Sequence, residues 1–258
     1  MNHTSPAQTG TSNRGRAFLG DQILLASIVL SAGGAAVMGF VYHEPTLALV
    51  AAVLLAGLSA GVYAMARGTL FSRLALTTLQ VALVALHIQL AHGEIEYHFG
   101  VFVTLALLLV YLDWRPILLA AALYAVHHVM FDRLQAAGFG FYCLTEPNFG
   151  RIVLHAGYVV VQTALEVVLV LGMGRTAREG EELAALVARV DQADGIALDV
   201  AGVRVETPLA TSLRSALLRM QTVVASVQQS AAQIEVASRE IAQGNPVSYT
   251  HLTLPTSD

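Results

Sequence analysis

Long apolar runs, separated by short polar stretches, fill the chain as far as residue 173. A bilayer core about 30 Å thick needs about 20 apolar helical residues, and three of the runs reach that length. A fourth run is close to it. The two that remain are too short alone, so each must extend through polar residues in order to cross. The runs are 22–42, 46–65 and 150–173, then 74–91, and the two short ones 99–112 and 116–130.

The amino-acid composition supports insertion into a membrane. The chain is 55% hydrophobic and only 12% charged, unlike a soluble globular domain. Its formal charge of −4 is spread along the sequence, which gives no reason to expect a nucleic-acid partner. The first apolar run lacks a small-residue cleavage site, so we interpret it as a retained span. We predict an all-α protein in which residues 1–18 form a cytoplasmic tail and residues 19–174 form a six-helix transmembrane bundle in contact with lipid.

The arginine distribution gives this bundle an orientation. Six spans place both termini on one side, and most arginines in the connections lie on that side, which the positive-inside rule assigns to the cytoplasm. We therefore predict a multi-pass protein of the inner membrane with both termini cytoplasmic. The arginines on the side of the termini are Arg14, Arg16, Arg67, Arg73, Arg115, Arg175 and Arg178, and those opposite are Arg133 and Arg151.

Histidines gather at the opposite, outer side. One interfacial histidine taken alone is more often hydrogen-bonded or solvated than a metal ligand. Seven of the nine histidines share the outer ends of the apolar runs, however, and neutral imidazole is the commonest metal ligand, suited to copper, zinc and iron. This pattern predicts a metal site, with copper or zinc favoured and haem iron as the alternative. The seven are His43, His87, His92, His98, His127, His128 and His155.

Spacing ranks these histidines as ligands. His127 and His128 are adjacent, so on a helix they point about 100° apart and only one can face a common centre. His92 and Glu96 are four apart, which on a helix puts them on one face, where the carboxylate is a ligand or orients an imidazole. We rank His92, His98, His128 and His155 first as metal ligands, then Glu96, His87 and His127, and we rank His43 last. Cys143 is the only cysteine and is interpreted as a structural thiol.

The last apolar run also carries a buried acid. His155, Gln162 and Glu166 repeat at helical spacing down one face of it, and Glu166 lies about 16 Å below His155 at 1.5 Å per residue. Two hypotheses stay open for Glu166. It either relays a proton or couples the outer site to the inner end, or it is a buried acid hydrogen-bonded to Gln80 or Tyr111 of a neighbouring helix.

After residue 173 the pattern changes to that of a soluble helical segment. A helix over 180–190 and a connector over 194–206 with two glycines precede Thr207-Pro208, which is a good helix start. Apolar positions then recur by threes and fours, which predicts a coiled coil and hence a homodimer. The string 246–258 resembles a translated sequencing adapter, so we expect it to be an artefact that breaks the coil at Pro246, with the natural protein continuing beyond it. The apolar positions are Leu213, Leu217, Met220, Val224, Val227, Ala231, Ile234, Ser238 and Ile241.

The string Ser238-Arg239-Glu240-Ile241-Ala242-Gln243-Gly244-Asn245 resembles the opening of the signalling hairpin of methyl-accepting chemotaxis proteins. Residues 175–224 resemble a HAMP linker, with Glu206-Thr207-Pro208-Leu209 in place of its usual entry sequence, and 225–245 would begin the signalling coiled coil. The six-span part is similar to histidine-rich sensor modules, through Gly93-x-Ile95-Glu96-x-His98-Phe99 and Asp113-Trp114-Arg115-Pro116. The resemblance implies a chemotaxis kinase and its coupling protein as partners of the full-length protein.

These observations predict a membrane chemoreceptor fragment that senses a metal ion or a haem-linked signal and relays it to a cytoplasmic coiled coil. Two other classes are alternatives for the same histidines. A membrane metalloenzyme would need paired histidine boxes, which are absent, and a haem-bearing electron carrier would need two facing histidines such as His87 and His155. No nucleotide loop or nucleophile motif occurs, so we predict no catalytic residues and no enzyme activity.

Overall fold

The computed structural model describes residues 7–192 and 195–251, with side chains over 15–192 and 195–243. Helices make up nearly all of this part of the chain, so the prediction of an all-α protein is confirmed apart from two strands of two residues each. Five of the described helices are long and apolar enough to cross a bilayer, which indicates a membrane protein. The elements are α1 Ala7–Val41, α2 Pro45–Ala66, α3 Leu70–Leu90, η1 Ile95–His98, α4 Phe99–Leu107, η2 Leu108–Tyr111, α5 Trp114–Ala136, α6 Phe149–Val190, β1 Asp191–Gln192, β2 Gly195–Ile196 and α7 Pro208–His251.

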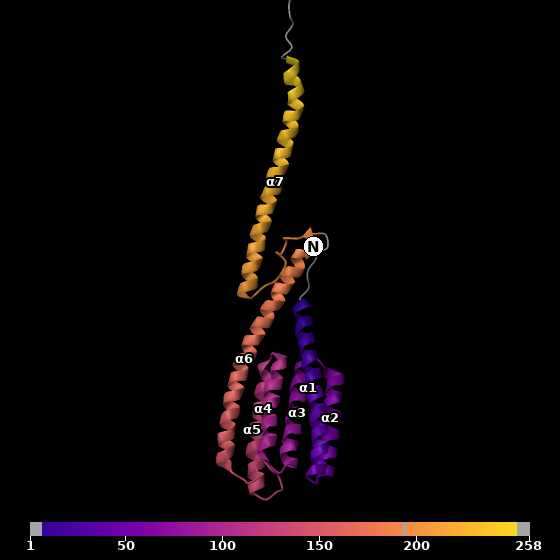
Figure 1. Cartoon of the computed structure of the whole chain (residues 1–258), viewed down its shortest axis with the longest axis vertical. Helices are drawn as coiled ribbons and strands as arrows, with labels where there is room; N and C mark the ends of the chain where they lie inside the picture. Colours follow the sequence, from indigo (N-terminus) through magenta and orange to yellow (C-terminus); the bar gives the residue numbers. More distant parts are fainter. Residues whose placement is uncertain (1–6, 193–194, 252–258) are drawn as a thin grey trace, which may run out of the picture. The chain divides into compact units, whose positions relative to one another are not determined.

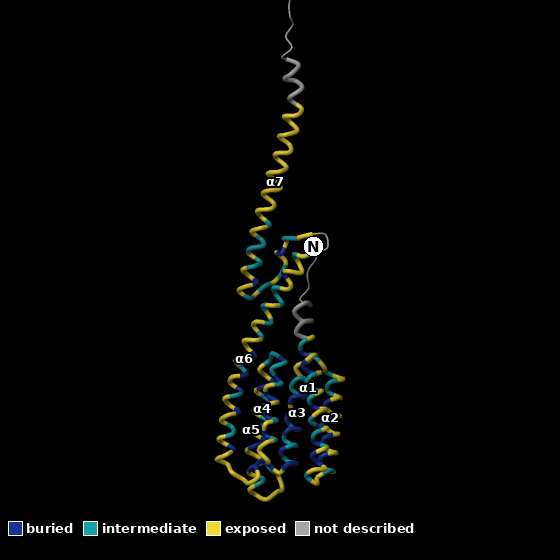
Figure 2. The backbone as a smooth tube through the Cα atoms, viewed as in Figure 1, coloured by how far each residue is buried: buried dark blue, intermediate teal, exposed yellow. Residues whose placement is uncertain are grey.

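The chain divides into two units, residues 1–175 and 176–258, and α6 contributes to both. In the first unit the helices lie side by side (Figure 1), with α1 packed on α2 and α3, and α3 packed on α5. Helix α3 is the most buried of the spanning helices (Figure 2). The outward faces of α2 and α6 expose many Leu and Val side chains, as expected for helices that face lipid.

A buried carboxylate joins three elements at the end of this unit where α3 begins. Asp21 on α1 is fully buried and accepts hydrogen bonds from the Gly68 amide (2.6 Å), the Ser72 hydroxyl (2.6 Å) and the Tyr111 hydroxyl (2.9 Å). The neighbouring Gly20 leaves room for the Tyr111 ring, because a Cβ there would lie 2.5 Å from two ring carbons. The network therefore ties α1 to the α2–α3 turn and to η2.

The opposite end carries the polar extensions of the two short apolar runs. Helix α5 continues past both histidines to Ala136, as the length argument requires. The other run differs, because α3 ends at Leu90 and a turn with positive φ at His92 (50°) and Gly93 (80°) precedes η1. The prediction that His92 and Glu96 share a helix face is therefore wrong. A Cβ on Gly93 would lie 2.2 Å from the Leu144 carbonyl carbon, so glycine lets the α5–α6 loop approach this turn.

The second unit consists of the end of α6, the two short strands, a connector and α7. Leu186, Val200 and Ala210 form its small buried core. The connector turns back so that α7 starts beside α6 and runs in the same direction (Figure 1). Helix α7 continues to His251, so the predicted helix break at Pro246 is wrong; a helix can retain an internal proline at the cost of one hydrogen bond. The last residues of the predicted artefact, 252–258, lie outside the described part of the chain.

Candidate metal centre

Two buried histidines present free ring nitrogens to each other. His98 is the last residue of η1 and His128 lies on α5, with their ring centroids 5.4 Å apart. The Nδ1 atom of His98 lies 3.1 Å from the Glu94 carbonyl oxygen, and that of His128 lies 2.8 Å from the Tyr124 carbonyl oxygen. When Nδ1–H donates to these carbonyls, each Nε2 keeps its lone pair, and both Nε2 atoms are buried without a hydrogen-bond partner. This is the tautomer and the outer support that metal-binding imidazoles require.

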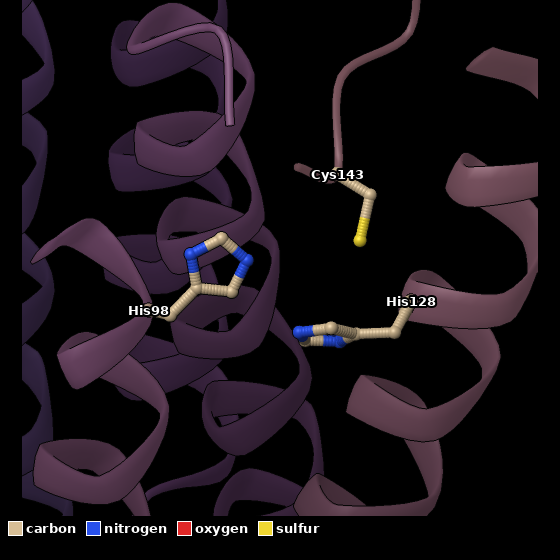
Figure 3. A group of neighbouring side chains, drawn as sticks. All are labelled: His98, His128 and Cys143. Atoms are coloured by element: carbon tan, nitrogen blue, oxygen red, sulfur yellow. The ribbon is translucent and has the colours of Figure 1, made fainter. Parts of the chain in front are cut away.

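Cys143 supplies a third donor. It lies in the loop between α5 and α6, is fully buried, and directs its sulfur toward the two imidazole rings (Figure 3). One donor atom each from His98, His128 and Cys143 lie within 4.8 Å of one another. Metal–nitrogen bonds of about 2.0 Å and metal–sulfur bonds of about 2.3 Å would need these donors to approach by about 1 Å, which side-chain rotation can supply.

Two glutamines fix the loop that carries this thiol. The Gln135 Oε1 atom accepts from the amides of Cys143 (2.9 Å) and Leu144 (3.3 Å), and its Nε2 donates to the Leu144 carbonyl (2.6 Å). Gln89, near the end of α3, accepts from the Tyr142 amide (2.9 Å) and donates to the Gly140 carbonyl (3.1 Å). The backbone on both sides of the thiol is thereby bonded to α3 and α5.

The surroundings of Cys143 keep its thiol protonated. Burial, followed by the nearby charge of Asp132, raises the pKa of Cys143 to about 12. Asp132 itself is fully buried, pairs with Arg133, and accepts from the Asn148 amide at 3.0 Å. A metal ion that binds the sulfur would therefore displace a proton from it.

His155 on α6 lies next to the three donors. Its ring centroid is 5.2 Å from that of His128, with the planes 20° apart, and 5.6 Å from that of His98. Its Nε2 atom is also buried without a hydrogen-bond partner, so it is available as a fourth ligand. A cavity of about 540 Å³ is lined by these three histidines and by the exposed Glu94 and Glu96.

Three of the four first-ranked histidines, His98, His128 and His155, thus lie together, and the fourth does not join them. His92 is exposed and its ring lies 4.7 Å from that of Tyr142. Glu96 is exposed on η1 and lines the cavity of about 540 Å³, whereas His92 does not line it, because the turn at His92 and Gly93 separates the two residues.

The remaining histidines have other surroundings. His127 is buried with a free Nε2, but its ring packs on Phe131 at 4.1 Å. His87 places its Nε2 2.8 Å from the Ser31 carbonyl oxygen on α1. His43 is exposed in the α1–α2 turn. Only one member of the adjacent pair 127 and 128 therefore faces the donors, which is what the helical angle between neighbours requires.

Sequence reasoning did not include Cys143 among the ligands. One signal was present, since Cys143 lies in the long connection on the same predicted side as the histidines. No family model, curated protein or solved structure matches the chain. The site consists of one buried thiol and two buried imidazoles, with the half-buried His155 beside them, and this donor set suits a soft or borderline metal ion.

Proposed function

We propose that the protein is a membrane sensor that binds one Cu(I) ion at His98, His128 and Cys143, and that relays occupancy through α6 to a cytoplasmic helical region. The observation that carries this proposal is the convergence of three buried donor atoms within 4.8 Å. Two of these donors are imidazole nitrogens with no other partner, and leaving such groups buried and unpaired is costly.

Charge favours Cu(I) over Zn²⁺. A thiolate with neutral imidazoles balances one positive charge, whereas a divalent ion would leave a net charge in a buried site, which is costly. The nearby Asp132 carboxylate offsets that charge only in part, because it already pairs with Arg133. Haem iron is less favoured, because the Nε2 of His87 already lies within hydrogen-bonding distance of the Ser31 carbonyl.

The proposed topology has six spans. The segment from Ile95 to Tyr111 is short for a span, but its first and last four residues are 3₁₀-helical. Because a 3₁₀-helix rises about 2.0 Å per residue, the segment reaches about 29 Å, close to the hydrocarbon thickness. With six spans, the arginine distribution puts both termini in the cytoplasm and the metal site at the outer face.

The relay runs along α6. This helix carries His155 near its start and continues without a break to Val190 in the second unit. The helix, the connector and the parallel helix of that unit resemble a HAMP linker. In this chain, Glu182 accepts hydrogen bonds from the backbone amide and the hydroxyl of Thr207 at the start of α7. If the bound ion takes His155 as its fourth ligand and thereby favours one position of α6, it would shift the equilibrium between two packings of this linker.

The apolar seam of α7 supports a homodimer. In the single chain the side chains of Met220, Val227, Ile234 and Ile241 are all more than half exposed. Such a seam on a helix in water is explained by pairing with a second copy in a coiled coil. In the full-length chemoreceptor, the chemotaxis kinase and its coupling protein would read the state of this coiled coil.

The test is a Cu(I) titration of the purified chain in lipid nanodiscs, without oxygen and against a chromophoric chelator. We expect one Cu(I) per chain, at least 100-fold weaker binding for Cys143→Ser and His98→Ala, and no change for His43→Ala. Tighter binding of Zn²⁺ than of Cu(I) would contradict the assignment of the metal. Equal affinity in Cys143→Ser and the unchanged protein would contradict the site.

The relay has its own readout. Hydrogen exchange of residues 176–243, measured with and without Cu(I), should change in the unchanged protein and not in His98→Ala. If exchange in this region is the same with and without the ion, the sensor proposal is wrong, even where the metal binds.

A further inference from the structure

Two cavities reach His128 and His155, and they differ in charge. One has a volume of about 520 Å³ and lies between α5 and α6, and none of its described lining residues is Asp, Glu, Lys or Arg. The other has a volume of about 540 Å³ and lies at the starts of η1 and α6, and we call it the outer cavity. An ion that passes an apolar wall loses its hydration without compensation, so the outer cavity is the less costly route to these histidines.

The outer cavity changes from charged and exposed at its mouth to buried at its floor. Glu94, Glu96 and Arg151 line it and are exposed. His98 and His128 line it as well, although they are only 2% and 5% exposed, and the Nε2 atom of each has no hydrogen-bond partner. The lining therefore joins charged groups in contact with water to two ligands of the proposed metal site.

The mouth carries a net negative charge, because it has two carboxylates and one guanidinium. The Tyr42 hydroxyl donates to Glu94 Oε2 at 2.6 Å, which holds this carboxylate in place and leaves its charge. A cation is attracted to such a mouth while water still hydrates it. Exposed charges of this kind change the rate of association more than the affinity.

The floor of the outer cavity is closed in this structure. The Nε2 atoms of His98, His128 and His155 have almost no accessible surface, so a ring must move before an ion can bind. His155 is the least buried of the three, and its ring stacks on that of His128 with 5.2 Å between the centroids. Rotation of the His155 ring would open the floor. Cys143 does not line the cavity, so an entering ion meets the imidazoles before the thiol.

We propose that the metal ion enters through the outer cavity, where Glu94 and Glu96 capture the hydrated cation and His155 then passes it to the two buried imidazoles. Cys143 binds last: its S–H bond breaks, the sulfur–copper bond forms, and the proton leaves to water. This inference rests on the proposed function, because it concerns the route to the same site.

The probe is Cu(I) supplied as its cationic acetonitrile complex, mixed without oxygen with the full chain in phosphatidylcholine nanodiscs. Stopped-flow absorbance of the copper–thiolate bond gives the association rate constant, and chelator competition gives the affinity. At low salt Glu96→Gln should bind about threefold more slowly, since a unit charge about 7 Å from the ion in water contributes about one RT. Arg151→Gln removes the opposite charge and should bind about threefold faster. The affinity of both variants should stay within about twofold of the unchanged protein.

Two control variants separate the effect of this cavity from other effects. Glu44→Gln removes the same charge from an exposed turn that does not line the outer cavity. Ala121→Leu narrows the apolar cavity between α5 and α6. Both should keep the association rate of the unchanged protein. Sodium nitrate at about 0.5 M should also bring Glu96→Gln and the unchanged protein to the same rate, because it screens exposed charges.

Each contrary result has its own meaning. Equal rates at low salt for Glu96→Gln, Glu44→Gln and the unchanged protein would overturn the entry route and leave the metal site intact. A loss of affinity in Glu96→Gln as large as its loss of rate would place Glu96 at the bound ion and overturn its role in capture. Slower binding in Ala121→Leu would assign entry to the apolar cavity. If the unchanged protein binds no Cu(I), the metal site is wrong, and the entry route with it.

Discussion

Replacing Gln135 with alanine should weaken metal binding without touching a metal donor. Its side chain makes three hydrogen bonds to the backbone of Cys143 and Leu144. Each contributes about 0.5–1.5 kcal/mol net, and water replaces part of this because Gln135 is only half-buried. The loop must then be ordered when the ion binds, which should cost about 1.4–2.7 kcal/mol, or about 10- to 100-fold in affinity.

The assay is the chelator competition with Cu(I), run beside two controls. Gln135→Glu keeps the oxygen that accepts from the Cys143 amide and should show an intermediate loss. Gln22→Ala, at an exposed position on α1, should bind like the unchanged protein. An affinity for Gln135→Ala within twofold of the unchanged protein, together with a large loss for Cys143→Ser, would refute the role of Gln135 in placing the thiol.

Two further predictions concern stability. Gly20→Ala should lower the thermal unfolding midpoint, because its Cβ would overlap the Tyr111 ring and overpacking costs about 1–3 kcal/mol. Gly33→Ala should leave the midpoint unchanged, because a Cβ there would meet no atom within 4 Å. Equal midpoints for the two variants would contradict the close packing of Gly20 on Tyr111. Burial alone would raise the pKa of Glu182, but hydrogen bonds from Thr207 and its neighbour outweigh this and lower that pKa. A lowered folded pKa means that the carboxylate stabilises the fold above the ordinary glutamate pKa and that this stability is lost as the pH falls through the folded value. Circular dichroism melts between about pH 6 and pH 3 should therefore show a steeper loss in the unchanged protein than in Glu182→Gln, and parallel curves would contradict this.

The fold followed from the sequence where periodicity and length decide the outcome. Apolar runs fixed the helices, because a spanning segment must satisfy its backbone internally. The turn after α3 was missed for a local reason. Two successive residues with positive φ, His92 and Gly93, end the helical spacing on which the pairing with Glu96 depended.

The site followed only in part, because it depends on contacts between distant segments. His98, His128 and His155 could be selected because the sequence predicts the same side of the membrane for all three. Cys143 could not be assigned a role from its own neighbours in sequence. Its position is set by Gln135 and Gln89, and long-range hydrogen bonds of that kind leave no periodic trace in a sequence.

The burial of the only cysteine also affects how long its thiol stays reduced when no metal ion is bound. Under the proposed orientation Cys143 belongs to the extracytoplasmic compartment, where exposed thiols oxidise and join other thiols. A sulfur that is covered and protonated reacts slowly with oxidants, since the thiolate is the reactive form. Under the proposed function, a copy of the protein that has lost its metal ion would therefore not need a reductase to bind it again, and two copies would not become joined by a disulfide bond.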